Sequence, residues 1–130
     1  IKRSKVEVLS TGYILIDGGK PTSVQYISNT MPIPHDKSEI AIATAIAGEL
    51  IGNKLIYLEG GSGAVNPVSA DMIETVRANI SVPLIVGGGL RTEGDICRAY
   101  KAGADIVVVG NILEKNFELY ESLLSVRNSF

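Results

Sequence analysis

The sequence predicts an α/β protein with a parallel sheet, and three observations support this class. Four short apolar runs begin near residues 12, 54, 83 and 105, and helix-like segments separate them. The runs are continuous stretches rich in Leu, Ile and Val, which is typical of a parallel sheet that is covered on both faces. Because parallel strands need crossover connections, we expect four β-α units in sequence order.

The first unit contains a long segment between its strand and its main helix. Residues 12–16 have the pattern of a buried strand, and 17–21 are turn residues. Residues 23–28 alternate polar and apolar side chains, so we expect them to return as a second strand of a hairpin. Pro32 and Pro34 indicate an irregular link, because each disfavours helix in the residue before it.

The main helix of this unit is expected to begin at Asp36 as its N-cap, with Glu39 completing a capping box, and to stop near Gly52. Residues 40–47 are apolar nearly all round, whereas a helix on one face of a sheet normally keeps a polar outer stripe. We therefore expect it to pack on two sides, against neighbouring helices or another subunit.

The remaining three units are regular. Thr92 and Asp95 have the spacing of a capping box, and Ser69 is a favourable helix start. We expect strands at 54–59, 83–87 and 105–109, and helices that begin near Ser69, at Thr92 and around Phe117.

Size and composition exclude several classes. A chain of 130 residues forms at most one domain, and 45% apolar with 20% charged residues is typical of a globular protein. A net charge of −2 without a basic stripe argues against nucleic-acid partners. The single Cys97 cannot form an internal disulfide and reads as core filler rather than as a nucleophile. We expect a cytoplasmic protein.

Glycines follow three of the four strands, at the end where ligands gather in parallel sheets. Without a Cβ, their N–H groups can approach an anion closely, and the next helix start adds positive potential. We therefore predict that three loops form one phosphate site. Its residues are Tyr57, Glu59, Gly88, Gly89, Gly110 and Asn111, with Ser62 or the N–H of Gly63 as further donors.

Glu59 is the one carboxylate at a strand end in this glycine-rich cluster, and Tyr57 points the same way because it lies two residues earlier on the strand. A Glu beside a bound polyol phosphate could take a proton from an attacking hydroxyl. Alternatively, Glu59 pairs with a nearby Lys or Arg and the glycines only make tight turns. Asp17 fits a turn better than a metal or substrate site, and Arg91 could reach an anion or simply be solvated.

These same residues resemble the geranylgeranylglyceryl phosphate synthases of archaea. The resemblance covers essentially the whole chain. It is carried by YLEGGSGA at 57–64, PLIVGGGLR at 83–91, GAD at 103–105 leading to Gly110-Asn111, and GYILI at 12–16. It implies a single partial domain over 1–130, made of strands five to eight and their helices, the C-terminal half of a TIM (β/α)₈ barrel.

The resemblance also implies an activity. Members of the family are prenyltransferases of archaeal membrane phospholipid biosynthesis. They form an ether bond between the geranylgeranyl group of geranylgeranyl diphosphate and the C3 hydroxyl of sn-glycerol 1-phosphate. Glu59, with Tyr57, would orient or deprotonate that hydroxyl. A homo-oligomer and peripheral membrane contact through the lipid product are implied too. Glycerol 1-phosphate would be held by Tyr57, Leu58, Glu59, Gly60, Gly61, Ser62, Gly63, Gly88, Gly89, Gly110 and Asn111.

The chain departs from the family in length. The magnesium carboxylate of the family follows its first strand, in a half with no counterpart here, so we expect Mg²⁺ ligands outside this chain and a protein near twice its length. Because 130 residues cannot close an eight-stranded barrel, strands 12–16 and 105–109 would be exposed edges unless another segment pairs with them. Three alternatives stay open: another phosphate-binding barrel enzyme such as an isomerase or lyase, a bacterial heptaprenylglyceryl phosphate synthase, and a non-catalytic half-barrel module.

Overall fold

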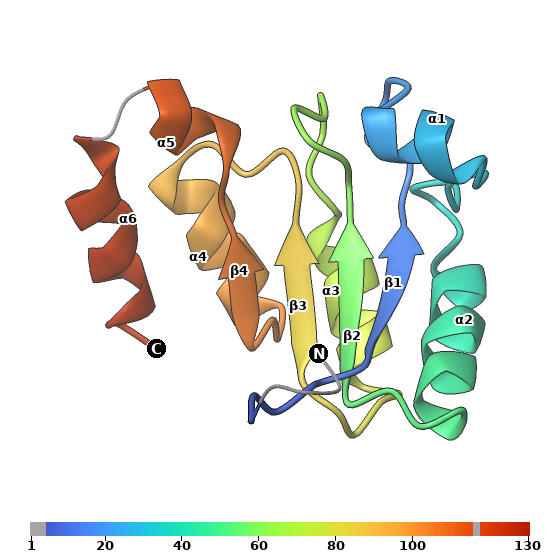
Figure 1. Ribbon diagram of the computed structural model, residues 1–130. Coiled ribbons are helices and arrows are strands. Elements are labelled where there is room, and N and C mark those ends of the chain that lie inside the picture. The colour runs from blue at the N-terminus through green and yellow to red at the C-terminus, as the bar shows by residue number, and fades with distance from the viewer. Residues whose placement is uncertain (1–4, 116–117) are drawn as a thin grey trace.

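Four parallel strands form the centre of the molecule, and each pairs with the next one in the sequence. The computed structural model describes residues 5–115 and 118–130. The strands are β1 (Thr11–Leu15), β2 (Leu55–Glu59), β3 (Leu84–Gly87) and β4 (Ile106–Val108), in the order β1-β2-β3-β4 (Figure 1). In the register Leu15 lies opposite Glu59, and Glu59 lies opposite Gly87, so the carboxyl ends of three strands meet at one edge. The predicted parallel order is confirmed.

Helices cover one face of this sheet, and two short helices lie beyond the strand tips (Figure 1). The covering helices are α2 (Ser38–Leu50), α3 (Ala70–Arg77) and α4 (Glu93–Lys101), with α6 (Leu119–Arg127) packed against α4. At the tips lie α1 (Ser23–Ser28) and α5 (Asn111–Lys115). Among the described residues, no helix combines the length and the apolarity that crossing a bilayer requires.

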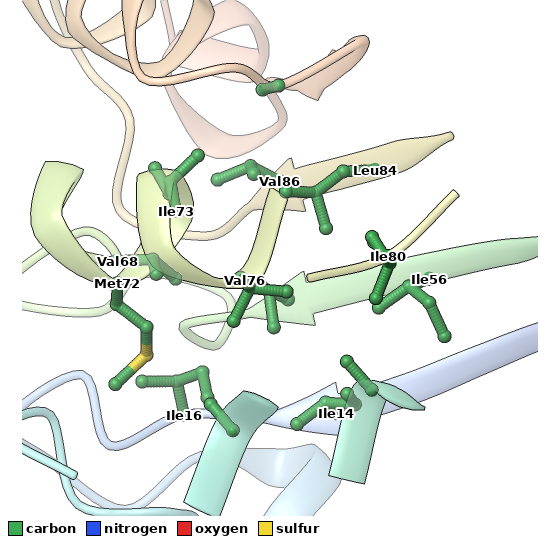
Figure 2. Packing of buried hydrophobic residues seen from close by; sticks show 14 of the residues in the cluster. Ile14, Ile16, Ile56, Val68, Met72, Ile73, Val76, Ile80, Leu84 and Val86 are labelled. Atoms are coloured by element: carbon green, nitrogen blue, oxygen red, sulfur yellow. The ribbon is translucent and has the colours of Figure 1, made fainter. Parts of the chain in front are cut away.

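The core lies between the sheet and the covering helices, and Figure 2 shows part of it. Alternate strand residues, Ile56 and Leu58 on β2 and Val86 on β3, are fully buried against Met72 and Val76 of α3. Burial of each such side chain contributes about 1.5–3 kcal/mol. The closely packed core therefore holds the carboxyl ends of the strands in fixed positions.

The opposite face of the sheet is not covered by helices in the described part of the chain. Tyr13, Ile106 and Val108 on this face remain 48%, 44% and 41% exposed. The expectation of cover on both faces, drawn from the continuous apolar runs, is thus wrong for this chain. In a closed barrel, inward side chains from all the strands fill this face, and four strands supply only part of them.

The predicted hairpin strand at 23–28 is wrong, because these residues form α1. The Gln25 N–H donates to Thr22 Oγ1 at 3.3 Å and caps this helix. The outer edge of β1 is met instead by Ile33, whose N–H donates to Leu15 O at 2.8 Å. A six-residue alternation is too short to separate the periods of strand and helix.

The capping box predicted for α2 is also wrong. The Lys37 N–H donates to Pro34 O at 3.0 Å, which places Asp36 in a turn, and the helix begins at Ser38 with no side-chain cap. Ala41 and Ala45 face the core, whereas Leu50 at the end of the helix is 81% exposed. Packing of α2 on a second side stays a prediction.

The other two helix starts are confirmed. The Met72 N–H donates to Ser69 Oγ at 3.2 Å, and Thr92 and Asp95 form the reciprocal capping box. The part of the last helix expected around Phe117 lies outside the described residues, and α6 follows from Leu119.

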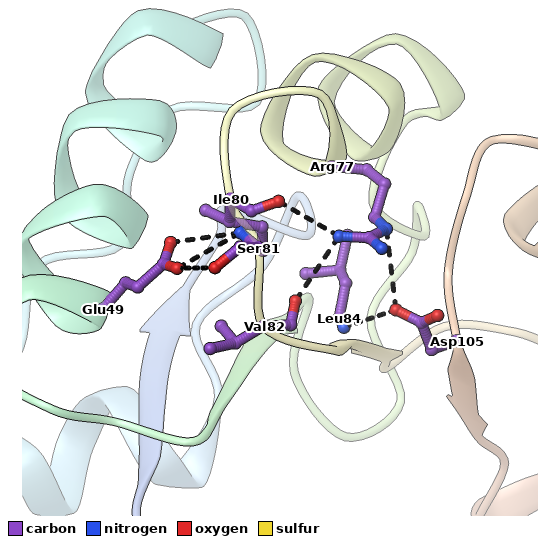
Figure 3. A network of polar contacts seen from close by, with 7 residues as sticks. All are labelled: Glu49, Arg77, Ile80, Ser81, Val82, Leu84 and Asp105. Carbon is purple, nitrogen blue, oxygen red and sulfur yellow. Dashed lines mark hydrogen bonds and ion pairs between the residues drawn. The ribbon is translucent and has the colours of Figure 1, made fainter.

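A polar network ties the opposite, amino-terminal edge of the sheet together (Figure 3). The Leu84 N–H donates to Asp105 Oδ2 at 2.8 Å, and Arg77 Nε lies 3.6 Å from the same oxygen. Arg77 Nη1 also donates to Ile80 O at 3.1 Å. In barrels of this type, residues at this edge serve stability rather than chemistry.

Candidate functional site

A cavity of about 510 Å³ opens at the carboxyl edge of the sheet, where the loops after all four strands meet. Eight of the residues predicted from the sequence line it: Tyr57, Glu59, Ser62, Gly63, Gly88, Gly89, Gly110 and Asn111. The structure therefore brings the three glycine-bearing loops into one pocket. Gly60 and Gly61 are buried in the loop that carries Ser62, and the Leu58 side chain lies in the core on the helix side.

The loop after β2 is fastened to the end of β3. The Gly60 N–H donates to Gly87 O at 2.9 Å, and the Ala64 N–H donates to Gly61 O at 3.0 Å, which closes a tight turn. Gly88 has φ +82°, and a Cβ there would lie 2.5 Å from both Glu59 Oε1 and the Gly61 nitrogen. Glycine is required at 88 by backbone conformation and by space.

Glu59 is buried at the base of the cavity, with only 8% of its surface exposed. The Gly61 N–H donates to its Oε1 at 2.6 Å. No Lys or Arg in the described ranges forms an ion pair with it, so the simple salt-bridge interpretation of Glu59 is not what the structure contains. A buried carboxylate held by a backbone donor and open to a cavity can accept a proton or a hydroxyl hydrogen bond.

Two tyrosines flank this carboxylate. The rings of Tyr13 and Tyr57 pack edge to face, with their centroids 5.0 Å apart at 72°. Burial, followed by the charge of Glu59 and a hydrogen bond to it, raises the pKa of Tyr13 to about 12. Burial and hydrogen bonding to Glu59 raise the pKa of Tyr57 still further above its ordinary value. The raised pKa values favour the protonated phenols, which can donate hydrogen bonds to Glu59.

A side-chain hydrogen bond joins the first glycine loop, after β2, to the third, after β4. Ser62 Oγ donates to Asn111 Oδ1 at 3.0 Å. Asn111 Nδ2 lies 3.3 Å from the position that a Cβ on Gly63 would take, so this amide reaches the same turn. The Ser62 loop and the start of α5 thus hold each other in place.

Sequence reasoning missed several lining residues. Tyr13 occupies an inward position of β1, a position that strand periodicity could have assigned once the register was known. Lys20 lies just after the turn in which Asp17 Oδ1 accepts a hydrogen bond from the Gly19 N–H at 2.8 Å. Arg91, singled out as a possible anion ligand, lines the cavity, and its Nη2 donates to Ala64 O at 2.5 Å. The other lining residues are Val24, Leu90, Val108 and Ile112.

Comparison with known proteins assigns this arrangement to a family. The sequence profile of the PcrB family matches residues 1–127. This chain belongs to the PcrB family. A geranylgeranylglyceryl phosphate synthase of Chitinophaga pinensis is 53% identical over 123 residues, 95% of this chain and 49% of that protein. A protein of the same name from Spirosoma linguale is 50% identical over 130 residues, 100% of this chain and 52% of its own.

A solved structure with a similar fold carries a ligand. It is the (S)-3-O-geranylgeranylglyceryl phosphate synthase of Thermoplasma acidophilum in complex with its substrate sn-glycerol-1-phosphate, 32% identical, with a TM-score of 0.88 over 98% of this PcrB-family chain and 51% of that chain. The chain spans about half the length of these relatives. The fold expected from the sequence, half of a (β/α)₈ barrel, is confirmed, as is the family resemblance.

Proposed function

We propose that the protein containing this chain is a prenyltransferase that joins a geranylgeranyl group, from its diphosphate, to the C3 hydroxyl of sn-glycerol 1-phosphate. The observation that carries the proposal is the meeting of three glycine loops and one buried carboxylate, Glu59, in a single cavity. The glycerol-phosphate complex of the Thermoplasma acidophilum enzyme, with its TM-score of 0.88 to this chain, supports the same assignment.

In this proposal the phosphate lies among the glycine loops. Gly63, Gly88 and Gly110 line the cavity without a Cβ to block an anion, so their backbone amides are the donors we assign to it. Ser62 and Asn111 already bond to each other, which lowers the cost of ordering them when the ligand arrives.

Glu59 then acts on the glycerol. The C3 oxygen attacks the allylic carbon of the donor, a carbon–oxygen bond forms, and the bond to diphosphate breaks, with the electron pair leaving on diphosphate. The proton of the hydroxyl passes to the Glu59 carboxylate, whose Oε1 is fixed by the Gly61 N–H. Tyr57 remains protonated and orients the carboxylate as a hydrogen-bond donor. Fixed orientation of the two reactants supplies much of the rate.

That the protein binds Mg²⁺ through ligands outside this chain stays a proposal. In the described part of the chain, no three His, Cys, Asp or Glu side chains gather as a metal site, so we derive no step through the ion. Assembly into a homo-oligomer, a cytoplasmic location and peripheral membrane contact likewise stay predictions.

A prenyl-transfer assay with the intact protein tests the proposal. We expect ether formation with sn-glycerol 1-phosphate and much less with sn-glycerol 3-phosphate, because the loops fix one orientation of the glycerol. Comparing geranylgeranyl with heptaprenyl diphosphate separates the two donor lengths. Transfer to neither acceptor from either donor would refute the proposal and favour a half-barrel module or another barrel enzyme.

A further inference from the structure

We propose that Lys20 is a phosphate ligand of this cavity, in which its ammonium group pairs with a phosphoryl oxygen of an anionic substrate. The inference rests on the proposed function and extends it to a loop outside the three glycine loops. Lys20 follows β1, and its side chain lines the same cavity as Glu59 and Asn111.

The position of the ammonium group supports this role. Lys20 Nζ lies 3.5 Å from the point where a Cβ on Gly63 would stand, and Asn111 Nδ2 lies 3.3 Å from the same point. Two side-chain nitrogens from different loops thus approach one glycine, whose φ of +68° belongs to the turn over the cavity. An anion beside Gly63 would meet both donors.

The backbone that carries Lys20 is held against this glycine loop. Gly18 O accepts hydrogen bonds from the N–H groups of Val65 at 2.9 Å and Asn66 at 3.1 Å. A Cβ on Gly18 would collide with Gly60 O and with the Ala64 side chain, so the two loops are in close contact. A ligand group on a fixed loop starts close to its bound position.

Charge favours the same conclusion. Lys20 and Arg91 are the two cations that line the cavity, and the Arg91 guanidinium is engaged with Ala64 O. Lys20 forms no ion pair within the described ranges, so its charge is available to a ligand. A Lys ammonium binds phosphate as a compact point charge.

The test is calorimetric titration of the intact protein with sn-glycerol 1-phosphate, inorganic phosphate and inorganic diphosphate. We expect Lys20→Met, which keeps most of the apolar stem, to weaken binding about tenfold, and Lys20→Arg to retain most of the affinity. Lys54→Met is the matched control, since it removes one exposed charge just before β2, at the opposite edge of the sheet. Thermal unfolding of each variant checks that the fold is intact.

Weaker binding of any of the three anions in Lys20→Met alone supports the proposal. A loss shared by glycerol phosphate and phosphate assigns Lys20 to the acceptor, and a loss confined to diphosphate assigns it to the donor. If Lys20→Met binds all three as the unchanged protein does, the proposal is overturned while the proposed function stands. If the unchanged protein binds none of them, both fail.

Discussion

Ser62 and Asn111 are 49 residues apart in the sequence, yet the Ser62 hydroxyl donates a hydrogen bond to the Asn111 side chain at the mouth of the cavity. The bond links the loop after β2 to the start of α5. With the Gly60 N–H bonded to Gly87 O, all three glycine loops are connected through the first of them, the loop after β2. The three loops are thus fixed relative to one another, as the proposed anion site requires.

Glu59→Gln keeps the shape of the side chain but removes its basicity. We expect turnover to fall about 100-fold or more, the usual contribution of a general base, with a smaller change in the dissociation constant for glycerol 1-phosphate. Steady-state kinetics and calorimetry measure the two quantities. Glu74→Gln, on the exposed side of α3, is the matched control. Unchanged turnover in Glu59→Gln would remove this residue from the chemistry.

Gly88→Ala tests the proposed anion site. The substitution places a Cβ at φ +82° and against Glu59 Oε1. We expect a loss of about 1–2 kcal/mol in stability from the backbone alone and at least a tenfold loss of phosphate affinity, measured by chemical unfolding and calorimetry. Gly52→Ala has a comparable φ of +96° but meets no atom within 4 Å, so it isolates the backbone cost and should bind phosphate normally.

The raised pKa values of Tyr13 and Tyr57 predict an alkaline limit to stability. The folded state holds both phenolic protons more tightly than the unfolded state does. This contribution is complete below pH 10 and is lost as the pH rises toward 12 and beyond. We expect the free energy of unfolding to fall as the pH rises above 10, and to fall less in Tyr57→Phe. Urea titrations at a series of pH values from 8 to 11 measure this free energy in both proteins. If it fell with pH equally steeply in the two, the buried-phenol interpretation would be contradicted.

Asp105→Ala separates stability from binding. The substitution leaves the Leu84 N–H without its acceptor and Arg77 without its ion-pair partner. We expect the free energy of unfolding to fall by about 1–3 kcal/mol, chiefly because the Leu84 N–H loses its acceptor. Affinity for glycerol 1-phosphate should not change, because this network lies at the opposite edge of the sheet. A parallel loss of affinity at a temperature where the variant is folded would show that the two edges are coupled.

Much of the architecture could be predicted because it depends on local patterns. Continuous apolar runs gave the parallel strands, and Ser69 and Thr92 gave two helix starts, since a hydroxyl cap acts within three residues. The predictions of a strand at 23–28 and of an N-cap at Asp36 also relied on local patterns, and they were wrong. There, short local patterns competed with the pairing of Ile33 with β1 and with the turn that ends at Lys37, and neither can be read from the neighbouring residues.

The site was partly predictable. Glycines at strand ends indicate phosphate binding on chemical grounds alone, and eight of the predicted residues do share the cavity. Lys20 and Tyr13 were missed because their positions in the cavity wall depend on which distant segments the fold brings side by side. Lys20 had a sufficient explanation as part of a turn, and Tyr13 looked like any strand residue until its register with Tyr57 was known.

Backbone amide chemical shifts during titration with sn-glycerol 1-phosphate test the central claim most directly. If three loops form one anion cradle, the amides of Ser62, Gly63, Gly88 and Gly110 shift together and yield one dissociation constant. Shifts confined to a single loop, or different constants for different loops, would contradict it.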